Sequence, residues 1–207
     1  MTIDYRLLSN KNAKDNALIL TLPAFFEAVF TASEGKDEGQ LIGGLVSGLL
    51  ETTATNDLLI SVAIDLNATS TATSTSTASN VIKGCVLFSR LVFTAATADK
   101  PGKAINMMLL APMAVATTAQ KQGIGQRLIQ FSIQQMKQQG VDCLMTYGDV
   151  NFYGKVGFEP VDATLIKPPH SLAYPQSWLG QSLSPQPVTA FVGKTTCVRV
   201  LNNALYW

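Results

Sequence analysis

Short apolar runs at several places in the chain predict strands. Residues 3–8 (IDYRLL) alternate between apolar and polar side chains, and residues 57–65 (DLLISVAID) and 81–93 (VIKGCVLFSRLVF) have the same strand character. Residues 104–117 (AINMMLLAPMAVAT) are almost continuously apolar, which is typical of a strand buried on both faces. Because proline cannot donate to a sheet ladder, we expect a bulge at Pro112 that leaves backbone amides free for a ligand.

Other segments carry their apolar residues at helical spacing. Ser9 or Asn10 is placed to cap a helix through the Ala-, Leu- and Phe-rich segment that follows, and Pro23 should kink or restart that helix. A second helix is expected over residues 38–50, although Gly43, Gly44 and Gly48 weaken its helix propensity.

A βαβ unit is predicted around residues 104–149. A helix from Gly123 to Gln139 follows the apolar strand, and its two apolar stripes indicate packing on more than one side. Gly140 supplies the helix stop, and residues 141–149 (VDCLMTYGD) read as the next strand.

The turn between that strand and helix, AQKQGIGQRL (119–128), has features of an anion site. It is not a P-loop, and the dinucleotide pattern GxGxxG fails because Leu128 stands at the third glycine position. A helix N-terminus still offers unpaired N–H groups, and Gly123 and Gly125 would let an anion approach them. Lys121 and Arg127 add positive charge. The alternative is a close-packed connection without a ligand.

Composition narrows the candidate functions. The chain has 207 residues, consistent with a single domain over 1–207, and its net charge of +1 gives no electrostatic footprint for a nucleic acid. Three separated cysteines suggest reduced thiols and no metal site. The apolar stretches are too short or interrupted to span a membrane, and the first residues lack a signal peptide, so we expect a cytoplasmic protein. Residues 67–80, rich in Ser and Thr, predict a flexible loop.

Two motifs resemble a known family. LLAPMAVATTAQKQGIGQRLI (109–129) is similar to the central motif of the GNAT superfamily of acyl-CoA-dependent N-acetyltransferases, with Gln120, Gly123 and Gly125 at the signature positions. YGDVNFYGKVGFEP (147–160) looks like the family's tyrosine-bearing motif and most resembles its YhbS-like bacterial branch. The resemblance implies an α/β fold with a mixed, mostly antiparallel central sheet flanked by helices, in which a bulged strand and a splayed parallel pair form the CoA cleft.

The resemblance also implies a reaction: transfer of an acetyl group from acetyl-CoA to an amine by direct attack, with CoA as product and no metal. Amides of the turn would bind the pyrophosphate, and the bulged strand would contact the pantetheine arm. Tyr153 would be catalytic, donating a hydrogen bond to the departing thiolate, because reference pKa values make full proton transfer uphill by roughly 2 kcal/mol. The implied cofactor-binding residues are Met113, Ala114, Val115, Gln120, Lys121, Gln122, Gly123, Ile124, Gly125, Gln126, Arg127 and Asn151.

Several alternatives stay open. The base that deprotonates the amine could be Asp149, His170 or water, and Asp149 reads equally well as a helix cap. No acidic cluster is visible to bind a polycation, so we expect a small or partly apolar amine acceptor, with aromatic walls from FFEAVF and LAYPQSWLG. The protein would act as a monomer or homodimer. Other functions are a non-catalytic acyl-CoA-binding sensor and a structural protein without a CoA site.

Overall fold

The structure, a computed structural model, describes residues 2–9, 12–67, 81–96 and 105–207. They cluster into two compact units: the first comprises Met1–Leu87 and Pro112–Ser132, and the second comprises Phe88–Ala111 and Ile133–Trp207. Apart from Asn67, the predicted Ser/Thr-rich loop lies outside the described residues.

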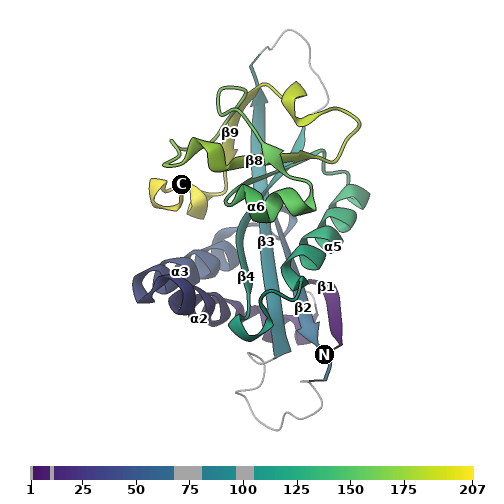
Figure 1. The fold of residues 1–207 in the computed structure, drawn as a ribbon, viewed down its shortest axis with the longest axis vertical. Helices are drawn as coiled ribbons and strands as arrows, with labels where there is room; N and C mark the ends of the chain where they lie inside the picture. The colour runs from purple at the N-terminus through teal and green to yellow at the C-terminus, as the bar shows by residue number, and fades with distance from the viewer. Residues whose placement is uncertain (1, 10–11, 68–80, 97–104) are drawn as a thin grey trace. The chain divides into compact units, whose positions relative to one another are not determined.

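The described part of the first unit begins with helices α1 (Ala13–Ile19), α2 (Leu22–Glu34) and α3 (Lys36–Thr52), of which α2 and α3 are labelled in Figure 1. The cap of α1 is Asn12, whose side chain accepts the Lys14 N–H, and not the expected Ser9 or Asn10. Pro23 lies in the first turn of α2, where its missing N–H costs no helical hydrogen bond. The predicted restart at this proline is therefore confirmed.

The glycines of α3 allow it to pack closely along α2. A Cβ at Gly39 would lie 2.7 Å from the Glu27 carbonyl oxygen, and one at Gly43 would lie 3.0 Å from the Glu27 Cβ. Leu22 and Phe26 of α2 and Val46 and Leu49 of α3 are fully buried. These glycines weaken helix propensity, and the close packing that they permit offsets that cost.

Within the described residues, one helical stretch, Ala13–Glu34, is long and apolar enough to cross a membrane by length and composition. This finding differs from the expectation that the apolar stretches are too short or interrupted to span a membrane. The core helix of a folded domain has the same properties. The apolar residues of α2 that are buried, Leu22, Phe25, Phe26 and Val29, recur at helical spacing and so share one face of the helix.

Strand β1 (Ile3–Leu8) pairs antiparallel with β2 (Leu58–Asp65), in register from Ile3 opposite Asp65 to Leu8 opposite Ile60. Strands β3 (Ile82–Ala95) and β4 (Asn106–Val115) contribute residues to both units, as does helix α5 (Ile124–Gln138). The strands follow the order β1-β2-β3-β4-β5-β8-β6.

In the second unit, β4 runs parallel to β5 (Cys143–Tyr147), and α5 connects the two strands along the chain. The predicted βαβ unit is therefore confirmed. Strand β8 (Trp178–Ser182) pairs antiparallel with both β5 and β6 (Glu159–Pro160). Strand β9 (Gly193–Cys197) is antiparallel to β3 and parallel to β7 (Ile166–Lys167).

The mixed, mostly antiparallel sheet expected from the sequence is confirmed. Strand β4 is continuous through Pro112, and its ladder to β5 ends at Leu110, opposite Thr146. The bulge at Pro112 stays a prediction. Among the residues that the structure describes, the remaining α-helix is α6 (Val150–Tyr153), and short 3₁₀ turns are found at Thr55–Asp57, Thr117–Ala119, Gly154–Val156, Pro175–Ser177, Val188–Ala190, Arg199–Leu201 and Ala204–Tyr206.

All three cysteines belong to the described residues and are free thiols. Cys85 and Cys143 are fully buried, and burial raises the pKa of both thiols. Protonated thiols in apolar surroundings are poor nucleophiles. These two cysteines therefore act as core residues.

Candidate functional site

The turn that precedes α5 reverses the chain through two left-handed residues. Lys121 has a φ of 60° and Gly123 has a φ of 73°. Glycine adopts this conformation without cost, whereas a residue with a Cβ is strained there. The sequence therefore tolerates strain at Lys121 to obtain this backbone path.

The start of α5 presents backbone amides. Its first intrahelical hydrogen bond runs from the Arg127 N–H to the Gly123 carbonyl, at 3.1 Å. The amides of Ile124, Gly125 and Gln126 come before that bond, and helix geometry leaves them without an intrahelical acceptor. Together with the helix dipole, they give this end of α5 a partial positive charge.

Two glutamine side chains hold the turn to the end of β4. The Gln120 Nε2 donates to the Val115 carbonyl at 3.2 Å, and the Gln122 Nε2 donates to the Thr118 carbonyl at 3.3 Å. Both side chains are thus occupied in fixing the backbone. The two side chains would contribute to a ligand site by holding the backbone amides of the turn in position.

Arg127 places its guanidinium at the turn. Its Nη2 donates to the Gln122 carbonyl at 2.7 Å, and its Nε donates to the Tyr5 hydroxyl at 3.0 Å. The Tyr5 ring lies 6.5 Å from the ring of Phe131 on α5. Among the described residues, no carboxylate is found in an ion pair with Arg127.

Sequence reasoning missed Tyr5. It lies 122 residues before Arg127, and no local pattern links the two. The one available signal was an aromatic side chain at an alternating position of the first predicted strand.

The end of β4 lies next to this turn in the first unit. Ala114 is buried, and Met113 and Val115 are half-buried. The next amide, that of Ala116, donates to the Lys83 carbonyl at 3.0 Å. A Cβ at Gly84 would lie 3.6 Å from the Ala114 carbonyl oxygen, in ordinary contact.

In the second unit, Tyr153 ends the short helix α6. Asp149 caps this helix, because its Oδ1 accepts both the backbone N–H and the side-chain Nδ2–H of Asn151, each at 2.9 Å. Asp149 therefore has the capping role that the sequence analysis left open. Asn151 is exposed, and its side chain bonds to this cap.

The Tyr153 ring is held from several sides. It makes edge contacts with Phe152 and Phe158, at centroid distances of 5.1 and 5.7 Å. A Cβ at Gly148 would lie 2.6 Å from the ring, so glycine is required there to admit it. Burial raises the pKa of Tyr153 from 10.0 to about 12, and a hydrogen bond with Thr146 opposes that rise. Tyr153 is therefore protonated at neutral pH.

Like Tyr5, Gly148 and Thr146 are site residues that were not identified from the sequence. Gly148 precedes Asp149 and reads as an ordinary turn glycine, and Thr146 is one polar residue in an apolar strand. Their roles depend on the packing of Tyr153 and appear only in three dimensions.

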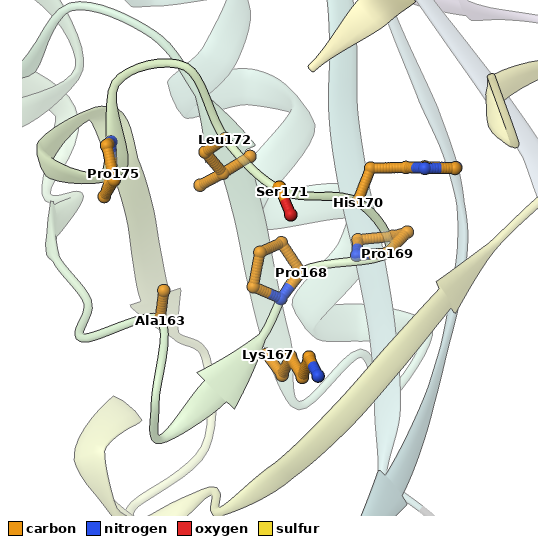
Figure 2. A pocket seen from close by; sticks show the side chains of 8 residues that line it. All are labelled: Ala163, Lys167, Pro168, Pro169, His170, Ser171, Leu172 and Pro175. Carbon is orange, nitrogen blue, oxygen red and sulfur yellow. The ribbon is translucent and has the colours of Figure 1, made fainter. Parts of the chain in front are cut away.

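A pocket of about 470 Å³ lies along the loop that follows β7 in the second unit (Figure 2). It contains His170, whose Nε2 lies 2.9 Å from Asn202 Oδ1 and whose ring extends away from Pro168 and Leu172. The lining residues include no carboxylate: they are Ala163, Lys167, Pro168, Pro169, His170, Ser171, Leu172 and Pro175.

The aromatic residues of the predicted LAYPQSWLG wall lie elsewhere. Trp178 is fully buried, and its Nε1 donates to the Ile166 carbonyl at 2.9 Å. Tyr174 is exposed, and its amide donates to the Tyr147 hydroxyl at 2.8 Å. Among the described residues, no cluster of His, Cys, Asp and Glu side chains is arranged to hold a metal.

Comparisons with known proteins find sequence matches to part of the chain. Residues 78–160 match the family model of the acetyltransferase (GNAT) domain. The uncharacterized N-acetyltransferase YjhQ of Escherichia coli (strain K12) is 33% identical over 109 residues, which make up 51% of this chain and 58% of YjhQ. The chain thus matches little more than half the length of that curated relative.

Solved structures share the fold. The GNAT family N-acetyltransferase YhbS from Escherichia coli, in complex with CoA, gives a TM-score of 0.68 at 18% identity, covering 97% of this chain and 92% of YhbS. A GNAT family acetyltransferase from Brucella melitensis, in complex with acetyl-CoA, gives a TM-score of 0.63 at 19% identity, covering 97% and 98%. The resemblance seen in the sequence is confirmed to this extent: residues 78–160 match the acetyltransferase (GNAT) domain, and the fold is that of the GNAT family structures.

Proposed function

We propose that this protein transfers an acetyl group from acetyl-CoA to the amine of a small acceptor. The observation that carries the proposal is the turn before α5, with its left-handed Gly123, its free helix amides and the charge of Arg127, which no carboxylate of the described residues pairs. The family supports it, as do the relatives that bind CoA or acetyl-CoA.

The turn has the chemistry that a pyrophosphate requires. Amides between Gln122 and Gln126 would bind the phosphate oxygens, and the charges of Arg127 and Lys121 would favour the anion. Gly123 lacks a Cβ that would stand in the way. The half-buried end of β4, from Met113 to Val115, would contact the pantetheine arm through its backbone, and an amide there would stabilise negative charge on the thioester oxygen.

Tyr153 would donate a hydrogen bond to the sulfur as it leaves. With its pKa at about 12 and a thiol near 8.5, complete proton transfer is uphill by roughly 5 kcal/mol. This difference is larger than reference values imply, because the hydroxyl is buried. The proton that finally reaches the thiolate would therefore come from solvent.

We propose that water removes the proton of the attacking amine. The Oδ1 of Asp149 already accepts two hydrogen bonds in its cap, which argues against a role for Asp149 as the base. As acceptor we propose a small, partly apolar amine, since no carboxylate lines the described pocket of the second unit to attract a polycation. We propose a cytoplasmic location, in keeping with the free thiols.

The test is a calorimetric titration of the purified protein with acetyl-CoA and with CoA, followed by an amine screen that detects thiol release. We expect micromolar binding and turnover. Gly123→Trp should abolish binding, whereas Gly44→Trp, at an exposed glycine with open space around it, should not. No binding by the folded wild type would refute the proposal, and binding without turnover on any amine would favour an acyl-CoA sensor.

A further inference from the structure

A buried hydroxyl lies beside Tyr153 in the middle of an apolar strand. Thr146 on β5 is 1% exposed, and its neighbours Leu144 and Met145 are fully buried. Its Oγ1 donates to the Leu110 carbonyl at 3.0 Å and also shares a hydrogen bond with the Tyr153 hydroxyl. Valine would have the same shape without the free-energy cost of burying a hydroxyl, so we expect the Thr146 hydroxyl to have a function.

The three oxygens share only two protons. The Leu110 carbonyl can only accept, and the hydroxyls of Thr146 and Tyr153 each carry one proton and can also accept. While the Thr146 O–H donates to the Leu110 carbonyl, the Tyr153 O–H can donate to the Thr146 oxygen or to another acceptor. If the Tyr153 oxygen becomes negative, the Thr146 O–H can rotate away from Leu110 and donate to it, and no heavy atom has to move.

The ring itself has little freedom. Phe152 and Phe158 contact it at its edges, and the space at Gly148 is only large enough for a hydrogen. The orientation of the neighbouring hydroxyl is therefore the adjustable part of the arrangement.

We propose that Thr146 is a positioning residue for Tyr153: its hydroxyl orients the tyrosine O–H and turns to stabilise the negative charge that Tyr153 gains when it donates to the leaving sulfur. This inference rests on the proposed function for its catalytic part. The hydrogen bond between the two side chains does not depend on that function.

The test compares Thr146→Val, which removes the hydroxyl and keeps the shape, with Thr146→Ser, which keeps the hydroxyl. Because hydrogen bonds to charged groups are the stronger ones, kcat should fall about tenfold in Thr146→Val with the KM for acetyl-CoA unchanged. Thr146→Ser should restore kcat. In a Tyr153→Phe background, Thr146→Val should have no further effect on kcat, and an equal loss in both backgrounds would overturn the inference.

A second measurement is independent of activity. The chain has five tyrosines, so ¹³Cζ-tyrosine labelling gives few NMR signals, and that of Tyr153 is assigned by its loss in Tyr153→Phe. This signal should shift in Thr146→Val and return in Thr146→Ser. An unchanged signal in Thr146→Val overturns the inference. If the Tyr153 signal shifts in Thr146→Val but the wild-type protein transfers no acetyl group, the proposed function is refuted and the hydrogen bond between the two side chains is established.

Discussion

Gly148→Ala tests how tightly the protein confines the ring of Tyr153. The added Cβ would lie 2.6 Å from Cε2 and 3.2 Å from Cδ2 of that ring. Ordinary carbon contacts begin near 3.5 Å, so the ring would have to move by about 1 Å. It meets Phe152 and the buried Phe158, and a shift of this size would disturb both contacts.

Overpacking of this kind costs about 1–3 kcal/mol of stability. In a chain of this length, each kcal/mol lowers Tm by roughly 2–4 °C, which gives a decrease of about 2–12 °C. If Tyr153 acts at the leaving sulfur, a displacement of about 1 Å should lower kcat by about a hundredfold. The Kd for acetyl-CoA should stay the same, because the proposed pyrophosphate site does not include this ring.

The assays are thermal unfolding, calorimetric titration with acetyl-CoA and steady-state thiol release. Gly154→Ala is the matched control: its Cβ would meet nothing within 4 Å, and its φ of −59° suits any residue. We expect wild-type Tm and kcat for this control. Gly148→Ala with wild-type Tm and kcat would show that the ring is not confined, and the argument for its positioning would fail.

Three further predictions address the turn, the cap and the tyrosine. Lys121→Gly should raise the free energy of unfolding by about 0.5–1 kcal/mol in urea titrations, since it relieves the left-handed strain at φ 60°; no gain would mean that the strain is absent. Asp149→Asn keeps a capping oxygen but removes the charge, so kcat should persist, and a hundredfold loss would identify Asp149 as the base. Because burial raises the pKa of Tyr153 to about 12, ionising this residue costs stability once the pH exceeds its unfolded pKa near 10. In denaturant titrations, the free energy of unfolding of the wild type should therefore fall by about 2–3 kcal/mol relative to that of Tyr153→Phe between pH 10 and 12, and a constant difference between the two proteins would refute the shift.

Periodicity in the sequence was sufficient to locate the long elements. The alternating residues of β1 and the apolar β4 were predicted to within a few residues, because each buries enough side chains to leave a pattern. The two-residue strands β6 and β7 are too short to show any period. Helix α3, Lys36–Thr52, extends two residues beyond each predicted end, and the packing of Gly39 and Gly43 against α2 is invisible in helix propensity.

The site was partly predictable for a similar reason. The turn at 120–127 has a local signature, since glycine spacing reflects backbone conformation directly. Tyr5 and Thr146 have none, because each acts on a residue from a different element. Asp149 had two local interpretations, and only the position of its Oδ1 beside Asn151 distinguished them.

The division of the chain also fixes the order in which the residues of the two units are synthesised. The first unit consists of residues up to Ser132, whereas the second begins at Phe88 and includes residues up to Trp207. At about 5–20 residues per second, a ribosome needs roughly 4–15 s to add residues 133–207. At the start of that interval all residues of the first unit have been synthesised, the turn before α5 included, while Thr146 and Tyr153 have not.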